Sequence, residues 1–167
     1  HRFDITDYLI EGENLLAVKV HKFCDGTWFE DQDMIYDGGI FRDVYLTSEP
    51  LVKIEDYVVV TDLDENYENA VLSLTADVRN LSTKAQSGWT IDVQAFDEAG
   101  NDILGGAVLP VDHVDSEGMS TFAIDIDVEK PELWSAEKPN LYALVLTLKD
   151  GEGKVVEILT TQLGFRE

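Results

Sequence analysis

The strict two-residue alternation of residues 121–128 constrains the fold of this chain more than any other feature. Phe122, Ile124, Ile126 and Val128 are apolar, and the positions between them hold alanine or aspartate. Only a β-strand places every second side chain on one face, because an α-helix returns to the same face every three to four residues. The chain must therefore contain a strand with one buried and one solvated face.

Similar alternating runs recur after residue 50, separated by turn-rich stretches at a spacing of roughly 8–12 residues. No run of helical period interrupts them. About seven short strands with such spacing are typical of an all-β, immunoglobulin-like sandwich of the constant type. The predicted strands are 54–61, 70–78, 89–96, 103–109, 121–128, 141–149 and 155–163.

The first part of the chain is less regular. It contains two alternating runs, Leu15–Val20 and Phe41–Thr47, which predict strands, and Pro50 marks its end. We therefore divide the chain into residues 1–50 and residues 51–167. Only the second segment has enough alternating apolar positions to build its own core, so we expect it to fold alone and the first segment not to.

The charge of the chain excludes two classes of partner. There are 34 Asp and Glu residues against 12 Lys and Arg, a formal net charge of −22. This field repels phosphate backbones and anionic lipid headgroups, which argues against nucleic-acid and membrane-surface binding. The acids are scattered along the chain, which favours a solvated surface; the alternative is that a few of them form a cation site.

Cysteine and histidine usage excludes further kinds of site. With Cys24 as the only cysteine, neither an intrachain disulfide nor a thiolate metal cluster can form. The natural compartment is then the cytoplasm, although the periplasm and secretion stay open. His1, His21 and His113 are far apart in sequence and form no zinc-binding pair.

Four stretches go beyond a generic sandwich. Residues 23–34 read Phe-Cys-Asp-Gly-Thr-Trp-Phe-Glu-Asp-Gln-Asp-Met, and residues 39–44 follow with Gly-Ile-Phe-Arg-Asp-Val. Residues 131–142 read Pro-Glu-Leu-Trp-Ser-Ala-Glu-Lys-Pro-Asn-Leu-Tyr, and residues 163–167 end the chain with Leu-Gly-Phe-Arg-Glu. In this order and at these distances, the stretches resemble the β-galactosidases of glycoside hydrolase family 2.

The resemblance implies separate roles for the two segments of this chain within a larger protein. Residues 1–50 would be the remnant of a jelly-roll sugar-binding domain, and residues 51–167 the immunoglobulin-like sandwich that follows it. The sandwich would act as scaffold and spacer and pack against a catalytic barrel that this chain lacks. The implied whole protein binds a β-galactoside, uses sodium and magnesium ions and forms a homo-oligomer.

The same resemblance implies retaining hydrolysis of terminal β-galactosides by two glutamates of the barrel. We therefore assign no catalytic residue to this chain and expect it to be inactive alone. The acidic cluster of Glu30, Asp31 and Asp33 is an alternative carboxylate pair. It is disfavoured because such a pair needs a fixed separation and a raised pKa, and the sequence indicates neither.

One residue matches a site residue of the family. Asp25, followed by Gly26, resembles the aspartate that binds sodium beside the galactose subsite and contacts the sugar. The alternative is that Asp25-Gly26 is only a turn, which both residue types favour. In this chain alone we favour the turn, because the other ligands would belong to the barrel. Cys24 and Thr27 depart from the residues of the best-known members.

A function of another class stays open from the residues alone. A free-standing carbohydrate-binding or adhesion-type sandwich would bind a glycan or calcium through Trp89, Trp134 or the acidic loop at Asp62–Glu65. Trp134 and Tyr142 could stack on sugar rings. Packing is the favoured interpretation for both, because the prolines beside them indicate a rigid connection.

Overall fold

The computed structural model of this chain describes residues 2–29 and 38–166 and divides into two units, His1–Thr47 and Ser48–Glu167. In its described part, the first unit contains only two short 3-10 helices, η1 (Thr6–Tyr8) and η2 (Asp25–Trp28). No helix in the described residues is long and apolar enough to cross a lipid bilayer.

The two strands predicted in the first unit are wrong. Leu15–Val20 and Phe41–Thr47 contain no strand. An extended segment becomes a strand only when its backbone N–H and C=O groups pair with a neighbouring strand, and the described part of this unit offers none. The apolar side chains that alternate along it are exposed, Leu15 to 97% and Phe41 to 80%. The pattern therefore marks residues whose packing partners are not in the described part of the unit.

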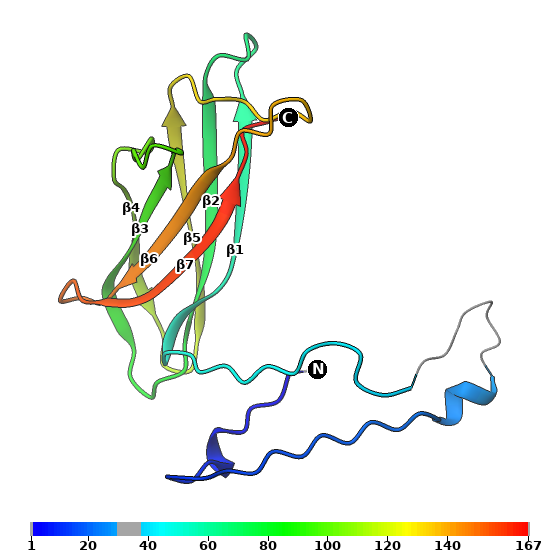
Figure 1. Cartoon of the computed structure of the whole chain (residues 1–167). Coiled ribbons are helices and arrows are strands. Elements are labelled where there is room, and N and C mark those ends of the chain that lie inside the picture. Colours follow the sequence, from blue (N-terminus) through cyan, green and yellow to red (C-terminus); the bar gives the residue numbers. More distant parts are fainter. Residues whose placement is uncertain (1, 30–37, 167) are drawn as a thin grey trace. The chain divides into compact units, whose positions relative to one another are not determined.

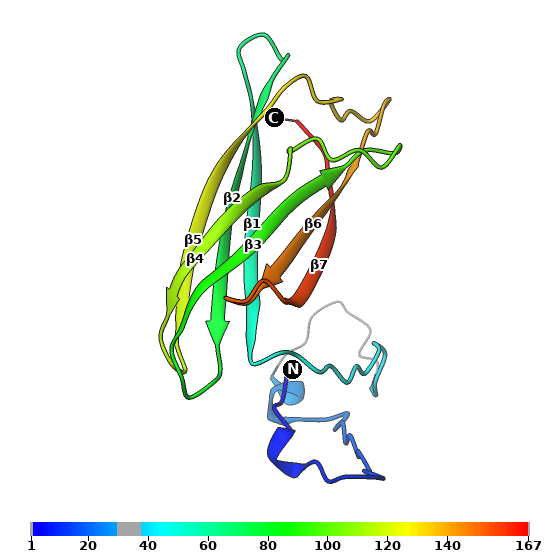
Figure 2. The same cartoon turned by 90° about the vertical axis from the view of Figure 1, so that its left-hand side faces the viewer.

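The second unit is an all-β sandwich, which confirms the predicted fold class. Its two antiparallel sheets have the strand orders β1-β2-β5 and β4-β3-β6-β7 and lie face to face (Figures 1 and 2). The strands are β1 (Val52–Leu63), β2 (Ala70–Asn80), β3 (Gln86–Phe96), β4 (Ala107–Val114), β5 (Met119–Val128), β6 (Tyr142–Lys149) and β7 (Val155–Leu163).

The core lies between the two sheets and contains the alternating apolar residues of their strands. In β2, for example, residues from Ala70 to Asn80 alternate between buried and more accessible positions. Fully burying a large apolar side chain stabilises a fold by about 1.5–3 kcal/mol, so this face supplies much of the driving force. The most completely buried large side chains include Leu72, Leu74, Ile91, Val93, Leu144, Leu146, Leu148 and Phe165.

One strand of the sandwich lies later in the sequence than predicted. The prediction was 103–109, but β4 begins at Ala107 and continues through Pro110. Gly105 and Gly106 have φ angles of +66° and +75°, which favour glycine and prevent a regular strand there. Proline is tolerated in β4 because this strand is an edge of its sheet, where a missing backbone donor can face solvent.

Asp64 closes the turn between β1 and β2. Its Oδ1 accepts hydrogen bonds from the backbone N–H groups of Asn66 (3.1 Å) and Glu68 (2.9 Å). Its Oδ2 accepts from the backbone N–H (3.1 Å) and the side-chain amide (2.8 Å) of Asn69. These hydrogen bonds, first of all the one from Glu68, hold the pKa of Asp64 below its ordinary value of 3.8.

Asn80 ties the ends of several strands together. The residue is fully buried (0% exposed). Its Nδ2 donates to the carbonyl oxygens of Lys84 (2.7 Å) and Asp115 (2.9 Å). Its Oδ1 accepts from the backbone N–H (2.9 Å) and the hydroxyl (2.6 Å) of Ser82. One amide thus joins the turn between β2 and β3 to the turn after β4, and no apolar side chain could replace these bonds.

Replacing Asn80 by alanine is expected to lower the free energy of unfolding by about 3 kcal/mol, because buried carbonyl groups would lose their donor. Urea unfolding followed by circular dichroism measures the change. Asn66→Ala, at an exposed position of the β1–β2 turn, is the matched control and should change stability by less than about 0.5 kcal/mol. An Asn80→Ala variant as stable as this control would contradict the assigned role.

The Asp64 turn predicts a specific pH dependence. Because the folded pKa of Asp64 is below 3.8, its carboxylate stabilises the fold above about pH 4, and this contribution is lost as the pH falls through the lowered pKa. Asp64→Asn should therefore be less stable than wild type near pH 6 and equal to it near pH 2. Urea unfolding at both pH values, with Asp62→Asn as control, tests this. A stability difference that is the same at both pH values would contradict it.

Candidate functional site

Asp25 is the first residue of η2 in the first unit. Its neighbours Cys24 and Thr27 hold the turn by reciprocal hydrogen bonds. The Thr27 N–H donates to the Cys24 carbonyl (3.0 Å), and the Cys24 N–H donates to the Thr27 hydroxyl oxygen (3.1 Å). The two residues at which the motif departs from the family pattern therefore form the turn that presents Asp25.

The carboxylate of Asp25 is exposed, and no residue in the described part of the chain forms a hydrogen bond or ion pair with it. Hard cations such as sodium and magnesium require several oxygen ligands. Residues 2–29 and 38–166 contain no group of three His, Cys, Asp or Glu side chains that could hold a metal ion. Asp25 is chemically suited to be one ligand, but the described residues do not form a complete site for either ion.

The acidic cluster of Glu30, Asp31 and Asp33 lies outside the described residues. The carboxylate pair considered for these residues is therefore not placed by the structure. Of the acidic residues in this motif, Asp25 is one whose local geometry is defined.

The structure brings together a serine, a histidine and an aspartate that the sequence did not reveal. Ser87 Oγ lies 3.0 Å from His113 Nδ1, and His113 Nε2 lies 3.1 Å from Asp115 Oδ1. Ser87 and His113 are direct partners across β3 and β4, so only the strand register could have indicated the contact. The side chains of His113 and Asp115 are 55% and 85% exposed. Such solvated groups lack the water exclusion that nucleophilic catalysis uses, and we interpret them as a surface network.

The aromatic residues considered for sugar stacking take part in packing. Tyr142 is buried, its ring meets Phe165 edge-on at 5.4 Å, and its hydroxyl accepts the Glu132 N–H at 2.8 Å. Trp134 is half-buried, and the Arg166 guanidinium lies 5.1 Å from its ring. Trp89, also half-buried, packs against the core. These contacts support the packing interpretation of the aromatic residues.

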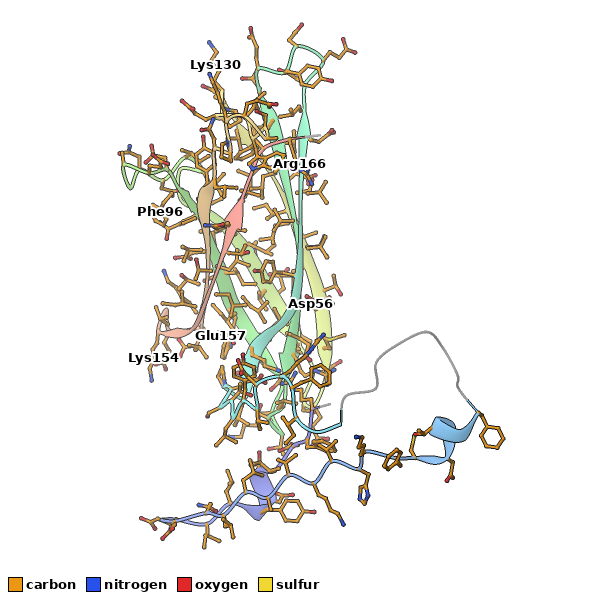
Figure 3. All side chains as sticks on the ribbon, turned by 45° about the vertical axis from the view of Figure 1, so that its right-hand side comes forward. Asp56, Phe96, Lys130, Lys154, Glu157 and Arg166 are labelled. Carbon is orange, nitrogen blue, oxygen red and sulfur yellow. The ribbon has the colours of Figure 1, made fainter. Side chains whose placement is uncertain are left out.

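The chain is held firmly where it leaves β7. Phe165 is fully buried and pairs in parallel with Leu133. The Thr61 hydroxyl of β1 donates to the Arg166 carbonyl (3.1 Å), and the Trp134 N–H donates to the Phe165 carbonyl (2.9 Å). Contacts with β1 and with the connection between β5 and β6 thus hold the chain at Arg166, which is labelled in Figure 3.

The acidic loop considered as a calcium site has a structural role instead. Both oxygens of Asp64 accept hydrogen bonds from Asn66, Glu68 and Asn69 of the same turn. Beside it lies an open depression of about 500 Å³ whose lining includes Asp62, Asp64, Asp127, Glu129 and Lys130. The described residues, this loop included, contain no group of three His, Cys, Asp or Glu side chains that could hold a metal ion, so they give the cation-binding alternative no support.

Two family models match this chain. Residues 52–166 match the model of the glycosyl hydrolases of family 2, and residues 1–50 match the model of the sugar-binding domain of that family. The two matches together cover nearly the whole sequence.

The alignments with curated relatives cover nearly the whole chain. A β-galactosidase of Priestia megaterium is 41% identical over 164 residues, which are 98% of this chain and 16% of the relative. A β-galactosidase of Clostridium acetobutylicum is 38% identical over 98% of this chain and 17% of the relative. The chain therefore spans about one sixth of the length of these relatives.

Solved structures share the fold. A β-glucuronidase of Bacteroides uniformis superposes with a TM-score of 0.70 at 24% identity, over 82% of this chain and 17% of that chain. A family 2 β-galacturonidase of Eisenbergiella tayi gives a TM-score of 0.57 at 22% identity, over 71% of this chain and 20% of that one. Because the family model of residues 52–166 covers more than half of the sequence, this chain belongs to the glycosyl hydrolases of family 2.

Proposed function

We propose that this chain is a non-catalytic part of a β-galactosidase that removes terminal β-D-galactose residues with retention of configuration. The observation that carries the proposal is the 41% identity to a β-galactosidase along 98% of the chain. The two glutamates that a retaining glycosidase needs are placed in the catalytic barrel of the whole protein and not in this chain.

The sandwich serves as scaffold and spacer. The segment that follows β7 is held by Thr61, which lies near the end of β1. Lys53 lies near the start of the same strand. At about 3.3 Å per residue, the strand between these two residues spans roughly 26 Å. A rigid body of this length, with both ends fixed, is suited to hold a sugar-binding domain and a catalytic barrel at a set distance.

Asp25 contributes one carboxylate to the sugar site of the whole protein. Its exposed position on a short, hydrogen-bonded turn leaves both oxygens available to a sugar hydroxyl and to a sodium ion. The remaining sodium ligands come from other parts of the whole protein. Magnesium, which the family resemblance also implies, is a further proposed ion of the whole protein.

The proposed partners follow from the same role. The sandwich packs against the catalytic barrel, the whole protein binds a β-galactoside and forms a homo-oligomer, and neither nucleic acid nor a membrane is a partner. A sequence with Cys24 as its only cysteine can form no intrachain disulfide, which is compatible with the reducing cytoplasm, where we place the protein.

Assays with a chromogenic β-galactoside test separately the activity of the whole protein and the inactivity of this chain alone. The purified chain of 167 residues should give no turnover, and the whole protein should hydrolyse the substrate with the anomeric configuration retained, as followed by NMR. A whole protein without β-galactosidase activity would overturn the proposed activity. Turnover by this chain alone would overturn its assignment as non-catalytic.

Asp25→Ala in the whole protein is expected to lower kcat/KM for the galactoside by about 30-fold, because a charged hydrogen bond worth about 2 kcal/mol is lost. The stimulation of activity by sodium should disappear as well. Asp7→Ala removes another carboxylate on a 3-10 turn of the same unit and serves as the matched control. An Asp25→Ala variant with unchanged kcat/KM and unchanged sodium response would refute the role of Asp25.

A further inference from the structure

Arg166, at the end of the sandwich, is a cation that the proposed function does not use. Its guanidinium lies 5.1 Å from the ring of Trp134. Lys53, Arg79 and Lys149 each pair with a carboxylate, but no carboxylate in the part of the chain that the structure describes forms an ion pair with Arg166. In a chain with a formal net charge of −22, this arginine is held on an aromatic ring and keeps a charge that a further group can neutralise.

The packing of Trp134 requires a glycine beside it. The Trp134 N–H donates to the Phe165 carbonyl (2.9 Å), and the indole packs against Gly164. A Cβ atom at Gly164 would lie 3.0 Å from Trp134 Cβ and 3.2 Å from its Cγ, closer than most Cβ contacts in proteins. Glycine therefore permits an approach of the backbone to the indole that a larger residue would hinder. The fold of the sandwich thus sets the position of the ring on which Arg166 lies.

The same residues line a small hollow that is open to solvent. Its lining is Trp134, Leu141, Gly164 and Arg166, its volume is about 300 Å³, and we call it the Trp134 hollow. Leu141 is 37% exposed. A pocket for a free small molecule buries most of that ligand's surface, which an open hollow with four lining residues does not do. The Trp134 hollow is suited instead to receive one or two anchoring side chains of a protein surface.

Hydrogen bonds order the segment that carries Trp134. Asn140 Nδ2 donates to the Leu133 carbonyl at 3.0 Å. The Ser135 N–H donates to the Lys138 carbonyl at 2.9 Å. A surface that is ordered in advance loses little conformational entropy when a partner binds. The segment therefore presents its side of the hollow in a form that is ready for docking.

We propose that the Trp134 hollow is the docking site for a carboxylate side chain of the catalytic barrel of the whole protein. The inference rests on the proposed function, which places the sandwich against that barrel. A guanidinium that lies on a ring keeps the N–H donors at its edge, and these can bind a carboxylate through two parallel hydrogen bonds. Trp134 and Leu141 supply apolar contact area for the stem of the same side chain.

Charge favours this occupant over a second copy of the chain. Each copy has a formal net charge of −22, so two copies repel each other before their surfaces meet. A carboxylate of the same polypeptide needs no such encounter. The chain spans 16% of the β-galactosidase of Priestia megaterium, so most of the surface of a protein of that length lies outside it.

Hydrogen exchange measured by mass spectrometry tests whether the hollow is covered. In the whole protein, the amides of residues 133–141 should exchange about 10-fold more slowly than in the chain of 167 residues, because a docked partner suppresses local opening. Arg166→Met in the whole protein should remove this difference. Lys154→Met, in the turn between β6 and β7 at the opposite end of the sandwich, is the matched control and should keep it (Figures 1 and 2).

Equal exchange in the two wild-type proteins would overturn the proposal, and this comparison needs no variant to fold. Unchanged slow exchange in a folded Arg166→Met protein would overturn it as well.

Cross-linking identifies the carboxylate and its source. A carbodiimide joins an amine and a carboxylate that are in contact into an amide and takes up the water that is lost. In the whole protein with Arg166→Lys, residue 166 should become linked to an Asp or Glu of the barrel. Absence of this link, a link to residues of the sandwich alone, or a link between ¹⁵N-labelled and unlabelled copies would overturn the proposal. A whole protein without galactosidase activity would refute the proposed function, and the cross-link would still decide the occupant of the hollow.

Discussion

The burial of alternate side chains between two sheets is the interaction on which the rest of this structure depends. Leu72 and Leu74 of β2 and Leu144 and Leu146 of β6 are almost completely shielded from water. Because the side-chain period of a strand is two, a shift of one residue would turn each apolar set toward solvent. The core therefore fixes the register of the strands, and the register fixes where the turns and the polar attachments lie.

Different kinds of interaction hold the chain at the two ends of the sandwich. At the end of β7, Phe165 is buried against Tyr142, and hydrogen bonds from the Thr61 hydroxyl and the Trp134 N–H hold the chain. At the start of β1, the attachment is ionic and centred on Lys53. Apolar burial is non-directional, whereas a buried ion pair demands defined geometry. Both attachments agree with the proposed role of the sandwich as a spacer, because they hold the chain at its two ends.

The sequence predicted the sandwich well because apolar and polar residues alternate along its strands, as in Thr121–Val128 within β5. It failed where alternation and turn chemistry competed, since Gly105 and Gly106 delay β4 to Ala107. It also failed in the first unit, where Leu15–Val20 has the pattern of a strand but finds no pairing strand in the described part of that unit. Asp25 could be proposed only through the family motif. The contact of Asn80 with the Asp115 carbonyl depends on long-range register and leaves no local signal, whereas Lys53 pairs with Glu49 and Glu55, which are near it in sequence.

The most direct test of this account is the unfolding of a chain that begins at Ser48, compared with the full chain of 167 residues. The account predicts one cooperative urea transition for both, with the same midpoint and the same m-value, because m scales with the surface exposed on unfolding and the first unit adds little buried surface. A shorter chain that has no cooperative transition, or a much lower midpoint, would show that residues 1–47 belong to the core and would contradict the account.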